Sequence, residues 1–176
     1  ETISVIGIGI IWTLLLLSST LSLRKFYQDD FDNGNLLIMH LNGFSFGFIA
    51  ILKTFSHFMF VQVPFLFSIP IASILLSIEN DKLIYLFASF AIGSLILSCL
   101  GSISSSMNLM NQRNFLLGSV IVMIFSVPII IFSVGIINME ENFNSLISVL
   151  FGILLIVFAI NPWASGLCLK LSLENS

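Results

Sequence analysis

The chain has 176 residues, of which 57% are apolar and 9% are charged, and its mean hydropathy is +1.11. Soluble domains carry about 25% charged residues, so this composition excludes an ordinary soluble protein and indicates an integral membrane protein. The formal net charge of −3 is small and scattered along the chain, which argues against nucleic acid as a partner.

Leu, Ile and Phe occur in unbroken blocks of roughly 20 residues, the length at which an α-helix crosses a ~30 Å hydrocarbon core. We therefore predict an all-α fold, a polytopic membrane helix bundle that forms a single transmembrane domain over residues 1–176. Five spans are expected, at residues 3–23, 55–78, 83–105, 115–137 and 146–169.

The first span ends at Arg24 and Lys25, and a charged segment, residues 24–54, follows it. Asp32-Asn33-Gly34-Asn35 is a turn signal within this segment, and the apolar run 36–41 after it is too short to cross a bilayer. We predict a surface-lying amphipathic helix here. The acids of this segment have two interpretations, as turn-formers and helix caps or as a docking face for a soluble partner; they are Asp29, Asp30 and Asp32.

Lys53 and His57 precede the deep part of the second span. A charge at the bilayer centre costs ~2.5 kcal/mol or more, so we place both residues at the interface and start the deep part near Phe55. Pro64 and Pro70 then predict a kink or a broken helix. Such a break marks either a moving part of a transporter or a static kink.

The third span carries small residues at spacings of three and four, from Ser94 to Ser105. Small residues let helices approach closely in lipid, so this face is expected to contact protein. The fourth and fifth spans contain one proline each, Pro128 and Pro162, which also predict kinks.

The basic residues divide unevenly if successive connections alternate between the two sides of the membrane. One side receives only Lys82, and the other receives Arg24, Lys25, Lys53, Arg113 and Lys170. This bias places the second group, with the C-terminus, in the cytoplasm or the mitochondrial matrix. Because Glu1 then lies outside, we expect a further N-terminal span and six spans in the full parent protein.

Sequence signatures of catalysis are absent: the chain has no GxxxxGK[ST] phosphate loop, HExxH or GxSxG motif. We therefore expect no ATP hydrolysis by this chain, no catalytic residue and no metal site. His40 and His57 are either interfacial, hydrogen-bonded histidines or ligands that meet through tertiary structure. Cys99 and Cys168 are read as buried small residues, because their spacing fits no metal or disulfide motif.

Several motifs, in order, resemble one family. Residues 24–34, RKFYQDDFDNG, look like the run that follows the second span of the haem exporter protein B (CcmB) family, a membrane subunit of the cytochrome c maturation system. Further resemblances follow at Lys53 to His57, at residues 63–70 (VPFLFSIP), 127–132 (VPIIIF) and 161–164 (NPWA), and at 170–174 (KLSLE). The chain departs from the family pattern at Leu37, where Glu is common, and at Phe58, where Trp is common.

The resemblance implies an ABC-2-like permease half with an inner-side coupling helix, which works with a separate ATP-binding subunit, other haem-handling membrane subunits and an outer-side haem chaperone. The permease half is then expected to lie in the bilayer of the mitochondrial inner membrane or the bacterial cytoplasmic membrane. Haem is then a ligand that is transported or handled, and no cofactor is predicted to be bound. The expected ATPase-docking residues are Arg24, Phe26, Asp29, Asp30, Asp32, Gly34, Leu36 and Leu41, with Lys53 and His57 as a functional interface.

Two alternatives remain open from the sequence. One is an ABC-2-type permease for another substrate, such as a lipid or a drug. The other is a non-transporting subunit of a respiratory complex, because usage rich in Phe, Ile and Asn suits an AT-rich organelle or endosymbiont genome.

Overall fold

The computed structural model describes residues 2–22, 25–75, 80–110, 116–138 and 143–174, and within these ranges all regular secondary structure is helical. The short helices are α2 (Gln28–Asp32) and α3 (Asn35–Leu41). Three segments join end to end, namely α4 (Phe46–His57), the π-helical turn η2 (Phe58–Gln62) and α5 (Val63–Leu75). The remaining helices are α1 (Thr2–Ser22), α6 (Asn80–Met110), α7 (Leu116–Asn138) and α8 (Phe143–Glu174).

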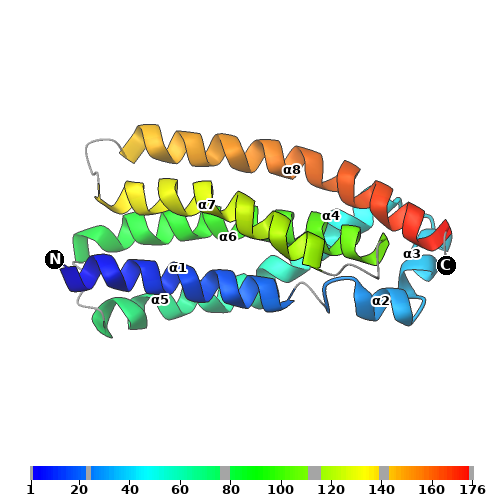
Figure 1. The fold of residues 1–176 in the computed structure, drawn as a ribbon, viewed down its shortest axis with the longest axis horizontal. Coiled ribbons are helices and arrows are strands. Elements are labelled where there is room, and N and C mark those ends of the chain that lie inside the picture. Colours follow the sequence, from blue (N-terminus) through cyan, green and yellow to red (C-terminus); the bar gives the residue numbers. More distant parts are fainter. Residues whose placement is uncertain (1, 23–24, 76–79, 111–115, 139–142, 175–176) are drawn as a thin grey trace.

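The long helices lie side by side, and consecutive ones run in opposite directions (Figure 1). Four stretches in the described residues are long and apolar enough to span a membrane, at Phe46–Leu75, Leu83–Met110, Gly118–Gly135 and Phe143–Glu174, and Ile6–Ser22 is a shorter apolar helix. One end of the bundle carries α2, α3 and the end of α8, and the other carries the starts of α1, α6 and α8. The predicted all-α, polytopic membrane bundle is confirmed.

Helix α6 lies at the centre, in contact with α8, α7, α4 and α1. Its small-residue face is buried, as predicted, and Ser94, Ser98 and Ser102 are each 0% exposed. Trp12 of α1 lies so close to this helix that a Cβ at Gly93 would clash with the indole ring. Small side chains on α6 therefore permit the close packing that helices need in lipid.

The second membrane helix begins earlier than the deep part predicted from residue 55. Ser45 caps it by accepting a hydrogen bond from the Phe48 N–H at 3.3 Å, and the helix runs from Phe46 through Lys53 and His57. Residues 76–78, the end of the predicted span, lie outside the described residues. The depth of the bilayer boundary along this helix stays a prediction.

The prolines affect their helices differently. The π-helical turn η2 ends directly before α5, whose second residue is Pro64, and a widened turn of this kind accommodates a residue that lacks a backbone N–H. Helices α5, α7 and α8 continue through Pro70, Pro128 and Pro162. The break predicted in the second span therefore takes the form of a π-helical turn, and kinks at the other three prolines stay predictions.

Helix α6 also extends past its predicted end at residue 105 to Met110. Asn108, which lies between the predicted third and fourth spans, is 7% exposed, and its Oδ1 accepts a hydrogen bond from the Gly118 N–H at 3.1 Å. This contact ties the end of α6 to the beginning of α7. The Asn108 amide thus acts within the helix packing instead of in the loop, whose residues 111–115 lie outside the described ranges.

Candidate functional site

The segment that joins α1 to α4 folds into a compact elbow, residues 25–45, at one end of the bundle (Figure 1). Phe26 and Tyr27 anchor it, because their side chains are only 7% and 0% exposed. The turn between α2 and α3 depends on Gly34, whose φ of 71° is left-handed and would strain a residue that carries a Cβ. The turn signal in the sequence therefore has a specific backbone role.

The three acids of the elbow lie in different environments. Asp30 forms an ion pair with Lys53 of α4, and one of its oxygens accepts a hydrogen bond from Asn35 Nδ2 at 3.1 Å. Asp32 is exposed and accepts from Gln28 Nε2 at 2.9 Å, and Asp29 is also exposed. The cluster therefore divides into one acid that ties the elbow to the bundle and two that face outward.

Helix α3 exposes apolar side chains on the outer surface of the elbow. Leu36 is 1% exposed and packs inward, whereas Leu37, Ile38 and Leu41 are 47%, 55% and 76% exposed. Exposed apolar side chains on the surface of a protein are typical of a site that binds another protein or a membrane. We call these three residues together with Asp29 and Asp32 the elbow face.

A buried polar network connects the elbow to three membrane helices. The Tyr27 hydroxyl lies 2.7 Å from Ser102 Oγ, which lies 3.2 Å from Ser165 Oγ. Ser165 donates to Asn161 Oδ1 at 2.9 Å, and Asn161 Nδ2 donates to Thr54 Oγ1 at 2.9 Å. All five side chains are at most 2% exposed, so the network joins the elbow, α6, α8 and α4 in an interior without water contact.

The direction of every bond in this buried polar network follows from the number of protons available. The Thr54 hydroxyl donates a hydrogen bond to the Ala50 carbonyl at 2.8 Å, and the Ser165 hydroxyl donates to Asn161 Oδ1. Ser102 must then donate to Ser165, which leaves the Tyr27 O–H as donor to Ser102. Burial raises the pKa of Tyr27, an effect larger than the opposite one of the Ser102 hydrogen bond, so this phenol keeps its proton. Bonds that all point one way strengthen one another.

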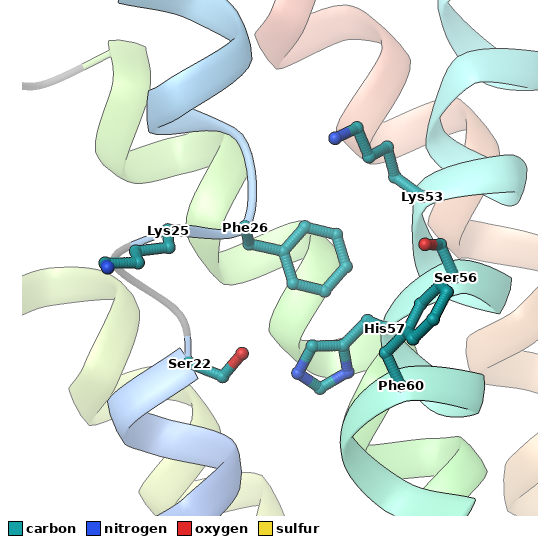
Figure 2. A pocket seen from close by; sticks show the side chains of 7 residues that line it. All are labelled: Ser22, Lys25, Phe26, Lys53, Ser56, His57 and Phe60. Atoms are coloured by element: carbon teal, nitrogen blue, oxygen red, sulfur yellow. The ribbon is translucent and has the colours of Figure 1, made fainter.

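A cleft of about 160 Å³ lies beside this network, where the end of α1, the elbow and α4 meet. Figure 2 shows the side chains that line it, which are Ser22, Lys25, Phe26, Lys53, Ser56, His57 and Phe60. The ring centroids of Phe26 and His57 are 4.8 Å apart, and His57 Nδ1 lies 3.1 Å from Ser98 Oγ on α6. The structure therefore brings together Lys53 and His57, the two residues predicted as a functional interface.

Comparison with known proteins identifies the family. The family model described as "CcmB protein" matches residues 1–172. The chain belongs to the CcmB family.

Curated relatives of this CcmB-family chain carry the name heme exporter protein B. The protein from Haemophilus influenzae is 27% identical over 178 residues, which cover 99% of this chain and 80% of the relative. The protein from Paracoccus denitrificans is 27% identical and covers 98% and 81%, and that from Rhodobacter capsulatus is 24% identical and covers 99% and 81%. The similarity thus extends over the elbow and all the described helices.

The predicted docking residues of the CcmB-family chain do not all lie on its surface. Phe26 and Leu36 are buried beneath the elbow, where they support it, and Arg24 lies outside the described residues. Asp29, Asp32 and Leu41 belong to the elbow face, and Gly34 shapes the turn beneath it. Docking through these residues stays a prediction.

The histidines lie in separate environments. His40 is exposed on α3, its ring centroid 4.1 Å from that of Phe46, whereas His57 lines the cleft. Within the described residues, no group of three or more His, Cys, Asp and Glu side chains could hold a metal ion. Cys99 and Cys168 are free thiols; Cys99 is buried, as the sequence indicated, whereas Cys168 is only partly buried.

Sequence reasoning missed the buried polar network of this CcmB-family chain. One signal was available, because an amide such as Asn161 within an apolar run needs a partner in the membrane. No signal marks Tyr27, whose partner Ser102 lies 75 positions along the chain, and Thr54 was noted only as part of the motif from Lys53 to His57. These pairings depend on the tertiary structure.

Proposed function

We propose that this chain is the membrane permease subunit of an ABC-type system that exports haem, or releases it to a chaperone, during maturation of c-type cytochromes. The match of the CcmB family over residues 1–172 is the observation that carries this proposal. A bundle of apolar helices with a charged elbow at one end is the architecture that such a subunit requires.

ATP hydrolysis belongs to a separate subunit in this proposal, and the elbow face is its docking site. The chain has no phosphate loop, so the energy of ATP must reach it through contact with a partner. Exposed Leu37 and Leu41 offer an apolar centre for that contact, and Asp29 and Asp32 offer charges at its border. This pattern of an apolar centre and a polar border is usual in protein interfaces.

Two connections would pass a movement of the elbow into the membrane. The ion pair of Asp30 with Lys53 joins α2 to α4, and the buried polar network continues from Tyr27 to α6 and α8. Both connections involve buried or partly buried groups, whose loss costs more than that of exposed ones. Movement of the elbow is therefore expected to carry α4, α6 and α8 together.

We further propose that the elbow and the C-terminus face the cytoplasm or the mitochondrial matrix, and that the chain lies in a bacterial cytoplasmic or mitochondrial inner membrane. Lys25, Lys53 and Lys170 lie toward the elbow end, in agreement with the positive-inside rule. Single cysteines at Lys82 and Arg113, in a background without Cys99 and Cys168, should react with an impermeant maleimide from opposite sides. Reaction from one side would refute this orientation.

Haem handling in this proposal also involves other membrane subunits and an outer-side chaperone. Both histidines of this chain lie in the half of the bundle that carries the elbow, so partner subunits are expected to supply the axial ligand on the outer side. Replacement of His40 and His57 by Ala should leave outer-side haem binding by the assembled complex intact. Loss of that binding would assign the ligand to this chain.

The function is tested by deletion of the chain from cells that make c-type cytochromes. Haem staining should show loss of covalently bound haem from these cytochromes, with recovery when the chain is restored. Normal haem-bearing cytochromes in the deletion strain would overturn the proposal and favour another transported substrate.

Docking is tested by the double substitution Asp29→Lys and Asp32→Lys, which reverses the charge of the elbow face and keeps the Asp30 ion pair. The matched control is Glu174→Lys, another exposed acid at the same end of the bundle. Copurification of the ATPase subunit should fall in the double variant and persist in the control. Equal recovery in both would remove the elbow face as the docking site.

A further inference from the structure

The cleft lined by His57 lies at the end of α1 that is joined to the elbow, and it has both a polar and an apolar wall. Ser22, Ser56 and Lys25 provide hydroxyl and ammonium donors, and Figure 2 shows the rings of Phe26 and Phe60 near the imidazole, Phe26 above it and Phe60 to its right. Phe60 is 81% exposed on a helix that is long and apolar enough to span a membrane, so we expect lipid to cover it. The cleft therefore joins a polar wall to a surface that we expect to face lipid.

His57 has one ring nitrogen that lacks a partner. The side chain is 8% exposed, and its Nε2 has no hydrogen-bond partner among the described residues. The Ser98 hydroxyl donates its hydrogen bond to the Ser94 carbonyl at 3.1 Å. It can therefore only accept from His57, so we assign the tautomer in which Nδ1–H donates to Ser98 Oγ. Nε2 of the neutral ring is then a buried acceptor on a residue that lines the cleft, and a ligand whose N–H or O–H reaches it would satisfy it.

The lysines of the cleft differ in the charge that they can offer a ligand. Lys53 is paired with Asp30, whereas Lys25 is exposed and has no ion-pair partner among the described residues. Lys25 at the rim therefore attracts an anionic group, and His57 further inside requires a donor. A ligand that fits must therefore carry both an anionic group and a hydrogen-bond donor.

Size restricts the ligand further. A volume of about 160 Å³ is less than the range of roughly 300–1,000 Å³ that is usual for sites of drug-sized molecules. The cleft thus accommodates a small polar group and not a complete tetrapyrrole ring, with the rest of the ligand outside.

We propose that this cleft binds the head group of a membrane phospholipid that ends in a hydrogen-bond donor, as phosphatidylethanolamine does. The phosphate lies at Lys25 and the neighbouring hydroxyls, the ammonium donates to His57 Nε2, and the acyl chains run along the exposed surface at Phe60. Phosphatidylcholine has the same charges but no N–H, so it satisfies Lys25 and leaves His57 without a donor. The site does not depend on haem export.

The wild-type full chain in nanodiscs tests this with an equimolar mixture of phosphatidylethanolamine and phosphatidylcholine. Native mass spectrometry counts the lipids that remain bound after mild release from the disc. A hydrogen bond that involves a charged group changes affinity by about tenfold or more, so retained phosphatidylethanolamine should exceed phosphatidylcholine by about that factor. Equal retention of the two lipids would overturn the proposal.

Two variants and one control locate the site. His57→Phe keeps a ring of similar size and should abolish the preference, whereas Lys25→Gln should reduce retention of both lipids. Lys170→Gln removes an exposed lysine of α8 that is no part of the cleft, and it should change neither property. A preference that persists in His57→Phe would place the lipid elsewhere. Because lipid retention is read without haem, its failure is distinguishable from failure of the proposed function.

Discussion

Two helix interfaces in this protein are held together in different ways. Helices α4 and α8 approach so closely that a Cβ on Gly166 would lie 3.0 Å from the Gly47 backbone nitrogen, and the buried polar network connects them with α6. Helices α1 and α7 instead border an apolar groove of about 510 Å³, lined by side chains such as Leu17 and Met123. Lipid tails are as apolar as these side chains, so the first interface specifies the packing and the second does not.

The difference between the α4–α8 interface and the α1–α7 groove indicates which parts of the bundle move together. The elbow is tied by Asp30 and Tyr27 to the closely packed interface, through Lys53 of α4 and Ser102 of α6. A groove that lipid can fill resists separation of its two helices only weakly, because apolar contacts within protein and with lipid are nearly equivalent. Motion driven at the elbow is therefore expected to change the α1–α7 spacing before it changes the α4–α8 spacing.

Of the substitutions at the two interfaces, Gly166→Ala is expected to have the largest effect, because it breaks the close contact of α4 and α8. The added methyl would meet backbone atoms of Gly47 at 3.0 and 3.2 Å, and backbone cannot rotate away as a side chain can. Overpacking of this kind lowers the free energy of unfolding by about 1–3 kcal/mol. Reversible unfolding in mixed detergent micelles measures the change.

The matched control for this prediction is Gly152→Ala, on the same helix. A Cβ at Gly152 meets nothing within 4 Å, so the change should be neutral or, through helix propensity, stabilising by about 0.5–1 kcal/mol. Equal destabilisation by both substitutions would show that the close approach seen at Gly166 does not determine the stability of the interface.

The next largest effect is expected from Asn161→Leu, which removes the centre of the buried polar network. Thr54 Oγ1 then loses its donor and Ser165 loses its acceptor, so the free energy of unfolding should fall by about 1–2 kcal/mol. A double-mutant cycle with Thr54→Val isolates the single bond, whose coupling energy should be about 0.6 kcal/mol and no more than about 1.7 kcal/mol. Additive effects of the two substitutions would contradict the contact.

Asn144→Ala is the control for the network, because this Asn is exposed near the start of the same helix. Its side chain lies outside the network, and substitution should change the free energy of unfolding by less than about 0.5 kcal/mol. A loss similar to that of Asn161→Leu would mean that any amide on α8 matters equally.

The sequence predicts the membrane helices, the small-residue face of α6 and the outline of the elbow. Hydropathy gives the membrane helices, because a stretch that crosses lipid must be apolar over a length set by the bilayer. The spacing of Ser94, Ser98 and Ser102 predicts a face in contact with protein, and the turn at Gly34 predicts a short helix after it. Each of these features depends on residues near one another in the chain.

Features that depend on distant residues could not be predicted. Lys53 was placed at the interface because an unpaired charge is costly in lipid, but its ion pair with Asp30 was not predicted. Thr54 and Asn161 are 107 positions apart, and periodicity along the chain contains no information about that pairing. The burial of Tyr27 could not be predicted either, because its aromatic ring and hydroxyl are equally suited to a membrane surface and to a buried position.

A smaller effect is expected from Tyr27→Phe, which separates the elbow from the closely packed interface and keeps the aromatic ring. The loss of one neutral hydrogen bond to Ser102 should lower the free energy of unfolding by about 0.5–1.5 kcal/mol. Hydrogen exchange of α2 and α3 should also become faster, because the elbow keeps only its ion pair and apolar contacts. Unchanged exchange in these helices would show that Tyr27 does not hold the elbow.

The smallest effect is expected in the groove between α1 and α7, from Met123→Ala. Met123 is 64% exposed on a membrane helix, so lipid replaces the contacts that the truncated side chain loses, and the free energy of unfolding should change by less than about 0.5 kcal/mol. Leu97→Ala on α6 is the contrasting variant, because this side chain is 0% exposed and leaves a cavity that costs about 2–5 kcal/mol. If Met123→Ala cost as much as Leu97→Ala, the groove would be a specific protein contact, and the distinction between the two interfaces would fail.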